Sequence, residues 1–228
     1  ISRHRWYSFL KMQKKVAPKI KNIITPSQSS KKGIIEEFGC LEETITVINN
    51  GLDTDEFAPV ELSTRDPFRL ITTASADVPL KGLDYSLKAL KQLKKEFPKI
   101  HLIVIGKMKE GGHTQRLIQK LNISDSVFFK SNLSKNDIKH LYSTSSIAIV
   151  SSLYEGFGYP VIEAMSCQVP LIATNVSSIP ELTLDHATLI SPKDANAIEK
   201  NVKEILLNYN FYKEKAFKGR NHIIETFN

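Results

Sequence analysis

The sequence predicts an α/β fold built on a doubly wound parallel sheet. From residue 67 onward, short apolar runs typical of buried strands alternate with helical patterns. The strand segments are apolar almost throughout, which indicates a sheet covered by helices on both faces. Hydrophobic residues make up 41% of the 228-residue chain and charged residues 24%, as in ordinary soluble globular proteins. We therefore expect one large domain, or a domain with a smaller piece beside it.

The first 57 residues carry elements of their own. Apolar side chains recur there at near-helical spacing with cations between them, at Trp6, Phe9, Leu10, Val16 and Ile20. They predict an amphipathic helix that frays or ends at Pro18. After it the pattern predicts strands over residues 22–25 and 44–48, and a helix over residues 28–38.

The segment from residue 67 to residue 173 follows a regular strand–helix order. Apolar runs predict five strands, over residues 68–73, 100–105, 127–129, 147–150 and 171–173. Leucines at helical spacing predict a helix from Leu83 to Phe97, with Asp84 near its start. A weaker helix is expected over residues 114–121. Ser134 and Asp137 form a predicted capping box that opens another helix.

A glycine-rich turn follows the predicted strand 147–150. Its glycines allow a sharp turn and close approach to a ligand, and Pro160 suits the first turn of a helix. The start of that helix favours an anion such as a pyrophosphate. Glu155 and Glu163 would repel a bare phosphate, so they are expected to hold hydroxyl groups, as on a sugar and a ribose. A nucleotide sugar contains all three parts, and doubly wound sheets bind ligands at the carboxyl ends of their strands.

The spacing of these glutamates resembles the signature of a known enzyme family. Glu155 and Glu163 have seven residues between them and Ala-Met after them, as in the retaining glycosyltransferases of family 4, which belong to the GT-B class. Four further stretches resemble the same family in the same order: residues 47–53, 81–84, 102–106 and 170–181. The resemblance extends from about residue 23 to residue 199, and five ordered matches are far more specific than one motif.

The resemblance implies a division of the chain into two parts. Residues 1–57 would be the tail of the N-terminal, Rossmann-like acceptor domain together with the interdomain link. Residues 58–228 would be the C-terminal nucleotide-sugar-binding domain. We therefore expect a fragment that lacks most of the first domain, and that also stops short of the family's returning C-terminal helix.

The resemblance also implies an activity. It is the transfer of a hexosyl group from a UDP or GDP sugar to an acceptor hydroxyl, with retention of configuration and without a metal or other cofactor. The acceptor, whether a saccharide, a lipid or a small molecule, is not indicated. Two other classes stay open: a nucleotide-sugar-binding module that is inactive without the rest of the N-terminal domain, and a GT-B-like epimerase or phosphorylase, against which the full motif set argues.

The family's site residues map onto this sequence by motif. By resemblance, Lys81 binds the donor phosphates and Glu155 orients the donor sugar, and these two are the predicted catalytic residues. Glu163 would accept hydrogen bonds from the ribose hydroxyls. Backbone amides of Gly156, Phe157 and Gly158 would bind sugar and phosphate oxygens. The backbone at Phe129 and Lys130 would hold the base, although an aromatic at a strand end is equally typical of a core.

One position departs from the family pattern. The family commonly has an arginine about five residues before the phosphate-binding lysine, where this chain has Ser75, Ala76 and Asp77. Aspartate has the wrong charge for a phosphate partner. Either another cation substitutes, for which Lys107 and Lys130 are candidates, or helix amides and hydroxyls contribute more of the phosphate binding.

The net charge of +7 is placed unevenly. Nine of the 31 Lys and Arg residues precede Glu36, the first acidic residue, so the other 22 stand against 24 Asp and Glu. This distribution argues against a nucleic-acid-binding face spread over the domain. The basic N-terminal helix could instead dock on an anionic membrane surface with Trp6 and Phe9 inserted, or pack its apolar stripe on the missing domain.

Several other classes of site are not indicated. No apolar run approaches the roughly 20 residues of a membrane span. Cys40 and Cys167 are too few for a disulfide framework, which favours a reducing compartment such as the cytoplasm, with the inner membrane face as the alternative. His101 and His140 have no partner at metal-ligand spacing, so no metal site is expected.

Overall fold

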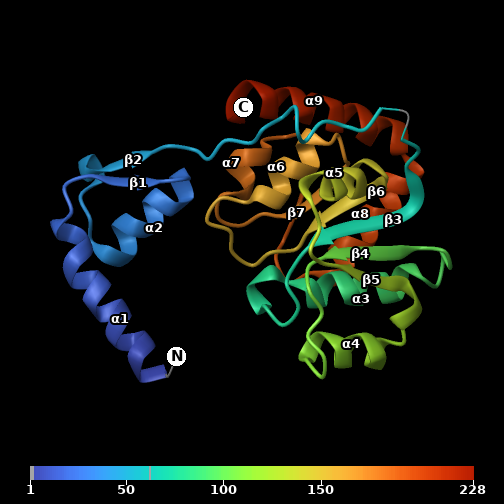
Figure 1. The fold of residues 1–228 in the computed structure, drawn as a ribbon, viewed down its shortest axis with the longest axis horizontal. Coiled ribbons are helices and arrows are strands. Elements are labelled where there is room, and N and C mark those ends of the chain that lie inside the picture. The colour runs from blue at the N-terminus through green and yellow to red at the C-terminus, as the bar shows by residue number, and fades with distance from the viewer. Residues whose placement is uncertain (1–2, 62) are drawn as a thin grey trace. The chain divides into compact units, whose positions relative to one another are not determined.

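The computed structural model describes residues 3–61 and 63–228, and side chains from Ser8 onward. The chain forms two compact units, Ile1–Asn50 and Gly51–Asn228, which are drawn in Figure 1 and described separately below. The sequence-based division after residue 57 thus lies seven residues beyond the end of the first compact unit.

The first unit consists of α1 (Arg3–Val16), a 3₁₀ turn (Ala17–Lys19), β1 (Ile23–Thr25), α2 (Gln28–Phe38), a 3₁₀ turn (Glu42–Thr44) and β2 (Ile45–Val47). The two strands pair in parallel. Ser27 caps α2 by accepting a hydrogen bond from the Ser30 amide, and Gly39 ends it in the left-handed region. These elements lie where the sequence predicts them, with Pro18 in the 3₁₀ turn that ends the first helix.

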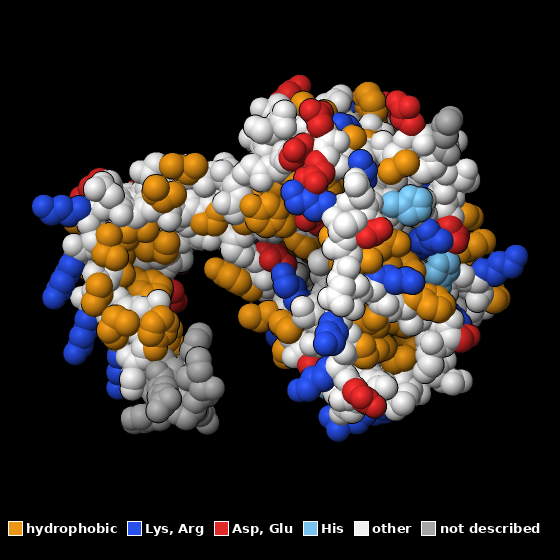
Figure 2. Space-filling model, viewed as in Figure 1, with side chains coloured by type: hydrophobic (Ala, Val, Ile, Leu, Met, Phe, Trp, Pro, Cys, Tyr) orange, Lys and Arg blue, Asp and Glu red, His pale blue; other side chains and the backbone are white. Residues whose placement is uncertain are grey.

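The first unit exposes an apolar groove. Its lining includes Met12, Val16 and Ile20 from the N-terminal segment and Ile34 and Phe38 from α2. Figure 2 shows hydrophobic side chains gathered on this unit and Lys and Arg side chains projecting along one edge. The side chain of Trp6 lies outside the described residues. Within the described part of the chain, no helix combines the length and the apolar character needed to cross a bilayer.

The second unit is built on a six-stranded sheet in which every neighbouring pair is parallel. The strand order is β5-β4-β3-β6-β7-β8. The strands are β3 (Asp66–Thr73), β4 (His101–Ile105), β5 (Val127–Lys130), β6 (Ser145–Val150), β7 (Leu171–Thr174) and β8 (Thr188–Ile190). The predicted doubly wound parallel sheet is confirmed, and its order reverses between β3 and β6.

Helices cover both faces of this sheet (Figure 1). One face packs against α3 (Leu83–Leu93), α4 (His113–Leu121) and α8 (Ala195–Leu207). The other packs against α5 (Lys135–Ser143), α6 (Tyr159–Ser166), α7 (Ile179–Thr183) and α9 (Tyr209–Phe227). Successive strand residues point to opposite faces, so Leu70 and Ile71 are buried in different core clusters. This is why the strand segments are apolar without alternation.

Local signals in the sequence account for several helix boundaries. Ser134 and Asp137 form the predicted capping box of α5. Helix α3 ends at Leu93, and Phe97 lies in the turns that follow, with its amide bonded to the Leu93 carbonyl. Short 3₁₀ turns, Pro79–Lys81 and Ser124–Ser126, precede α3 and β5. The sequence patterns described above did not predict α8 and α9.

The link after the first unit is held by α9. Leu52 and Phe57 are buried in the core of the second unit, and the Leu52 amide donates to the Phe227 carbonyl at 2.6 Å. Arg220 of α9 donates to the carbonyls of Thr54 and Phe57, each at 3.2 Å. Residues 51–57 therefore belong to the second compact unit because their backbone and side chains are bonded to it.

Arg65 joins three elements at the start of the sheet. Its guanidinium donates to the carbonyls of Tyr142, Ser145, Cys167 and Gln168 at 2.7–3.0 Å. Burial lowers the pKa of Arg65 from its usual value. These carbonyls lie in the last turn of α5, at the first residue of β6 and directly after α6. This one side chain therefore satisfies acceptors that the ends of the two helices leave open.

Arg65→Met should lower the free energy of unfolding by about 3 kcal/mol, because buried carbonyls would lose their donor. Chemical denaturation measures the change. Arg116→Met is the matched control, since Arg116 is exposed on α4. Equal effects of the two substitutions would contradict a structural role for the Arg65 hydrogen bonds.

Candidate active site

Two loops meet where the strand order of the second unit reverses. The β3–α3 loop carries Lys81, and the β6–α6 loop carries Glu155. Because β3 and β6 are parallel neighbours, both loops leave the same edge of the sheet. The crevice at such a reversal is the usual ligand site of doubly wound sheets.

The Lys81 loop is fixed to the end of β6. Gly82 has φ 63°, and a Cβ atom at this position would clash with the carbonyl oxygen of Ser151. The Ser151 hydroxyl donates to the Gly82 carbonyl at 3.0 Å, and the Leu153 amide donates to the Leu80 carbonyl at 2.7 Å. Glycine therefore permits the close approach that places Lys81 beside the β6–α6 loop.

Lys81 and Glu155, the two predicted catalytic residues, are in direct contact. The Nζ of Lys81 lies 2.7 Å from Oε1 of Glu155, and the Ser152 hydroxyl donates to the same oxygen at 2.6 Å. The Glu155 side chain is only 10% exposed, whereas the Lys81 side chain is 31% exposed. The pair thus presents a cation at the edge of the sheet above a buried carboxylate.

The turn between Glu155 and α6 is held by hydrogen bonds from Ser178. Gly158 has φ 115° and is the N-cap residue of α6, with Pro160 in the first turn as predicted. The Ser178 hydroxyl donates to the carbonyls of both Glu155 and Phe157. No side chain caps the start of α6. The amides of Val161 and Ile162 donate to the Gly158 carbonyl and Pro160 has no N–H, which leaves the Tyr159 amide at the start of this helix for a ligand.

Phe157 does not present its side chain to this site. Its ring is buried and packs edge-on against Tyr159 and Phe227, with ring centroids 5.5 and 5.9 Å away. Any contact of Phe157 with a ligand therefore comes from its backbone, as predicted for this residue and for Gly156 and Gly158.

Glu163 lies on α6 and faces the end of β3. Its Oε2 accepts a hydrogen bond from the Tyr142 hydroxyl at 3.4 Å, and that hydroxyl lies 3.0 Å from Oγ1 of Thr73. Burial raises the pKa of Glu163, and the Tyr142 hydrogen bond partly opposes the rise. The fold therefore holds the Glu163 carboxylate partly out of water, which disfavours its ionised form.

Glu163→Gln should stabilise the protein at pH 8. With a raised pKa in the folded state, ionised Glu163 costs folding free energy above that pKa, and the cost vanishes below the usual value of 4.5. Thermal unfolding at pH 8 and at pH 4 measures it: the melting temperature should rise only at pH 8. Glu110→Gln, on the exposed β4–α4 loop, is the control. A variant melting below the parent at pH 8 would contradict the expectation.

The structure places Phe129 and Lys130 at the carboxyl end of β5, two strands away from β3. The Phe129 side chain is partly buried against the core under α3 and α4, and Lys130 is exposed. The Lys130 carbonyl accepts a hydrogen bond from the Gly106 amide at 2.8 Å. These residues share the edge of the sheet with Lys81, and their predicted contact with the base stays a prediction.

Asp77 has a role that the sequence did not reveal. Its Oδ1 accepts from the Thr114 amide at 2.7 Å, and its own amide donates to the Thr114 hydroxyl at 3.0 Å. The bond from the Thr114 amide lowers the pKa of the Asp77 carboxyl. Asp77 thus caps α4, whose own N-cap residue, Gly112, has no side chain to do so. Gly111 and Gly112 precede α4 and have no side chains that could cap it, so the sequence does indicate that a cap would have to come from a distant residue.

Comparison with known proteins decides the family of this chain. The family model described as "Glycosyl transferases group 1" matches residues 55–222, which is most of the chain. The chain belongs to this family. Lys81, Glu155 and Glu163 all lie inside the matched region.

Relatives of known name support the same assignment. The chain is 34% identical over 226 residues to the MMP alpha-(1->4)-mannosyltransferase of Mycolicibacterium hassiacum, covering 98% of this chain and 54% of the relative. It is 27% identical over 185 residues to the O-antigen chain mannosyltransferase RfbU of Salmonella typhimurium, covering 81% of this chain and 51% of that one. The chain thus spans about half the length of these relatives.

Solved structures show the GT-B fold. A glycosyltransferase from Rickettsia africae matches with a TM-score of 0.81 at 24% identity, covering 100% of this chain and 63% of that one. Anabaena Alr3699/HepE in complex with UDP-glucose matches with a TM-score of 0.84 at 19% identity, covering 97% and 64%. The predicted fold class of this chain is confirmed.

The described residues of the chain contain no group of three or more His, Cys, Asp or Glu side chains that could hold a metal ion. Cys40 and Cys167 are both free and buried. The predictions of metal independence and of a cytoplasmic location stay predictions.

Proposed function

We propose that this protein takes part in transferring a hexosyl group from a nucleoside diphosphate sugar to an acceptor hydroxyl, with retention of configuration. The observation that carries the proposal is the contact of Lys81 with Glu155 across the strand-order reversal, beside the open start of α6. A cation, backbone amides at the start of α6 and two carboxylates, one in the loop before α6 and one on α6, match the phosphates and hydroxyls of such a donor.

The diphosphate would bind at Lys81 and the start of α6. Lys81 is held by one carboxylate oxygen, which a diphosphate can replace as its partner. Glu155 stays in place after that exchange because Ser152 also holds it. The lysine then follows the charge that builds on the leaving diphosphate, and the helix amides share that charge.

The two carboxylates would hold hydroxyl groups at opposite ends of the donor. Glu155, released from Lys81, accepts hydrogen bonds from the donor sugar near the reacting carbon. Glu163, about one helical turn into α6, accepts them from the ribose. A carboxylate can take both ribose hydroxyls at once, which fixes the nucleoside without a metal ion.

The proposed reaction does not require a side chain that acts as a strong base. The bond from the anomeric carbon to the leaving phosphate breaks while the acceptor oxygen bonds to the same face of that carbon. The acceptor proton passes to an oxygen of the leaving phosphate, so no side chain has to remove it. Positioning and charge stabilisation by Lys81 and α6 would supply the rate enhancement.

The comparisons narrow the donor that we would test first. Two relatives described above are named mannosyltransferases, which favours a mannosyl group. One solved neighbour was crystallised with UDP-glucose, which supports a nucleotide-sugar donor in general. We therefore propose GDP- and UDP-linked hexoses as the donor class.

Calorimetric titration with UDP, GDP and ADP tests the proposal, first without metal and then with magnesium. Binding of one nucleotide without metal, lost in Glu163→Ala, is the expected result. Binding only with magnesium would contradict metal independence. Binding of none would remove the donor site from this chain. Binding without sugar transfer to any acceptor would support the alternative of a donor-binding module that is inactive by itself.

Peripheral contact with a membrane through α1 stays a separate prediction. Exposed Phe9, Met12 and Val16 lie among lysines, which suits an anionic lipid surface. Packing against another part of the protein would cover the same residues. Flotation with liposomes distinguishes the two, because membrane docking requires retention on anionic liposomes and release from neutral ones.

A further inference from the structure

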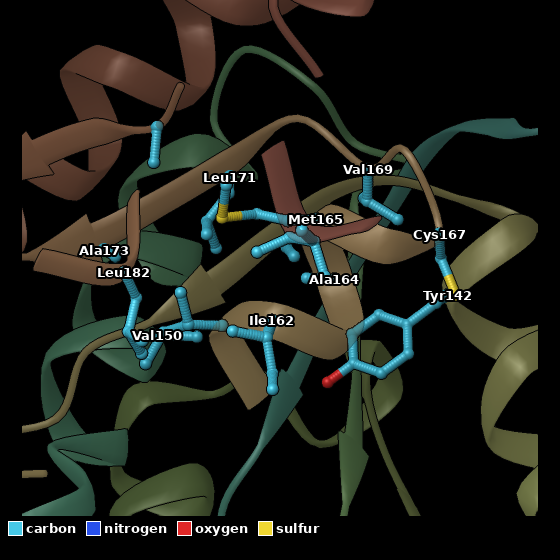
Figure 3. Packing of buried hydrophobic residues seen from close by; sticks show 14 of the residues in the cluster. Tyr142, Val150, Ile162, Ala164, Met165, Cys167, Val169, Leu171, Ala173 and Leu182 are labelled. Carbon is cyan, nitrogen blue, oxygen red and sulfur yellow. The ribbon is translucent and has the colours of Figure 1, made fainter. Parts of the chain in front are cut away.

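The hydroxyl of Tyr142 is buried between two polar groups of the candidate site. Tyr142 lies in the last turn of α5 and is 1% exposed. Its ring packs beside α6, and in Figure 3 the hydroxyl oxygen lies at the end of the ring away from Cys167. A phenylalanine would fill the same space, so packing alone does not explain the hydroxyl.

The direction of the hydrogen bonds follows from the number of protons. An ionised carboxylate only accepts, so the Tyr142 hydroxyl gives its single proton to Oε2 of Glu163, at 3.4 Å. The contact between Tyr142 and Thr73, at 3.0 Å, then requires Thr73 to donate to the tyrosine oxygen. The two hydrogen bonds therefore run in one direction, from Thr73 through Tyr142 to Glu163.

These two hydrogen bonds engage one carboxylate oxygen of Glu163 and leave the other oxygen for a ligand. Oε2 faces Tyr142, and Oε1 makes no hydrogen bond to any residue that the structure describes. The three residues come from the end of β3, from α5 and from α6, so the carboxylate is oriented by three separate elements. The Tyr142 hydrogen bond also favours the ionised form of Glu163, which is the form that accepts from hydroxyl groups.

We propose that Tyr142, supported by Thr73, is a positioning residue that orients Glu163 toward the ribose hydroxyls of the donor. The proposal rests on the proposed function, because it assigns the role of Glu163 to the ribose. Tyr142 itself does not touch the donor. Its contribution is therefore specific to ligands that carry ribose hydroxyls, and this specificity separates positioning from general support of the fold.

The test compares ribose and dideoxyribose ligands. Affinities of UDP, GDP and their 2′,3′-dideoxy analogues are measured by calorimetry for the parent chain and for Tyr142→Phe. The parent should prefer the ribose form about 10-fold or more, as expected for hydrogen bonds to a charged acceptor. Tyr142→Phe should lower the affinity for the ribose form about 5-fold and leave the dideoxy form unchanged.

Two further variants keep the test decisive. Valine has nearly the same shape as threonine, so Thr73→Val removes only the hydroxyl that donates to Tyr142. It should therefore also reduce the preference for the ribose form. Tyr209→Phe is the matched control, because the Tyr209 hydroxyl is buried without a hydrogen-bond partner among the described residues. It should change neither affinity.

Each outcome has a distinct meaning. Equal losses for ribose and dideoxy ligands in Tyr142→Phe would show a structural role and overturn the proposal, as would no loss at all. A parent chain that binds a nucleotide without preferring the ribose form would instead remove the ribose role of Glu163 from the proposed function. A loss confined to the ribose form in both Tyr142→Phe and Thr73→Val supports the proposal.

Discussion

Lys81→Met should lower the affinity for nucleoside diphosphates about 100-fold, the scale of losing one charged donor to an anion in a partly buried site. The Lys81 side chain is 31% exposed and its ammonium contacts the Glu155 carboxylate, so a diphosphate can reach it and take the place of that carboxylate as its partner. Methionine keeps most of the apolar stem and removes the charge. Calorimetry with the diphosphate that binds best measures the effect.

The controls for Lys81→Met separate charge from fold. Lys120→Met removes an exposed lysine from α4 and should change neither affinity nor stability. The corresponding nucleoside, which has no phosphate, should bind the parent and Lys81→Met equally. A similar loss for the nucleoside would mean that Lys81 supports the shape of the site rather than the phosphates.

Gly82→Ala should lower the free energy of unfolding by about 3 kcal/mol and reduce nucleotide affinity by at least 10-fold. Two costs combine: φ 63° is unfavourable for alanine by about 1 kcal/mol, and the added methyl would clash with the Ser151 carbonyl. Relief of that clash moves the loop that carries Lys81. Chemical denaturation and calorimetry measure the two effects.

Gly111→Ala is the matched control for this substitution. Gly111 has φ 65°, close to that of Gly82, but a Cβ atom there would meet nothing within 4 Å. It should show the conformational cost of about 1 kcal/mol and no loss of nucleotide affinity. If both variants behaved alike, the contact between the Gly82 and Ser151 segments would not be what positions Lys81.

Features that depend on neighbouring residues were predictable from the sequence. The buried strands, the capping box at Ser134 and the entry of α6 at Pro160 all follow from short patterns with a direct physical cause. The glutamate spacing around α6 depends on one turn and one helix, so it too is visible in a single stretch of sequence.

Features that depend on distant pairing were not predictable in this way. Tyr142 resembles any core aromatic until its hydroxyl is seen between Thr73 and Glu163. Asp77 appeared only as a departure from a phosphate-binding pattern, because its partner Thr114 lies 37 residues away. Helix α9 was missed since its polar and apolar residues alternate irregularly, and only its packing on α6 and the link explains it.

The Lys81–Glu155 pair joins residues 74 positions apart in the chain. Closing so long a loop is entropically costly and has to await pairing of β3 with β6, at the centre of the sheet. Partly folded chains, which lack this pairing, would have no donor site. A nucleotide would therefore bind only the native state and raise its stability by mass action. Nucleotide binding could then serve as a measure of how much of the protein has completed its folding, independent of any catalytic assay.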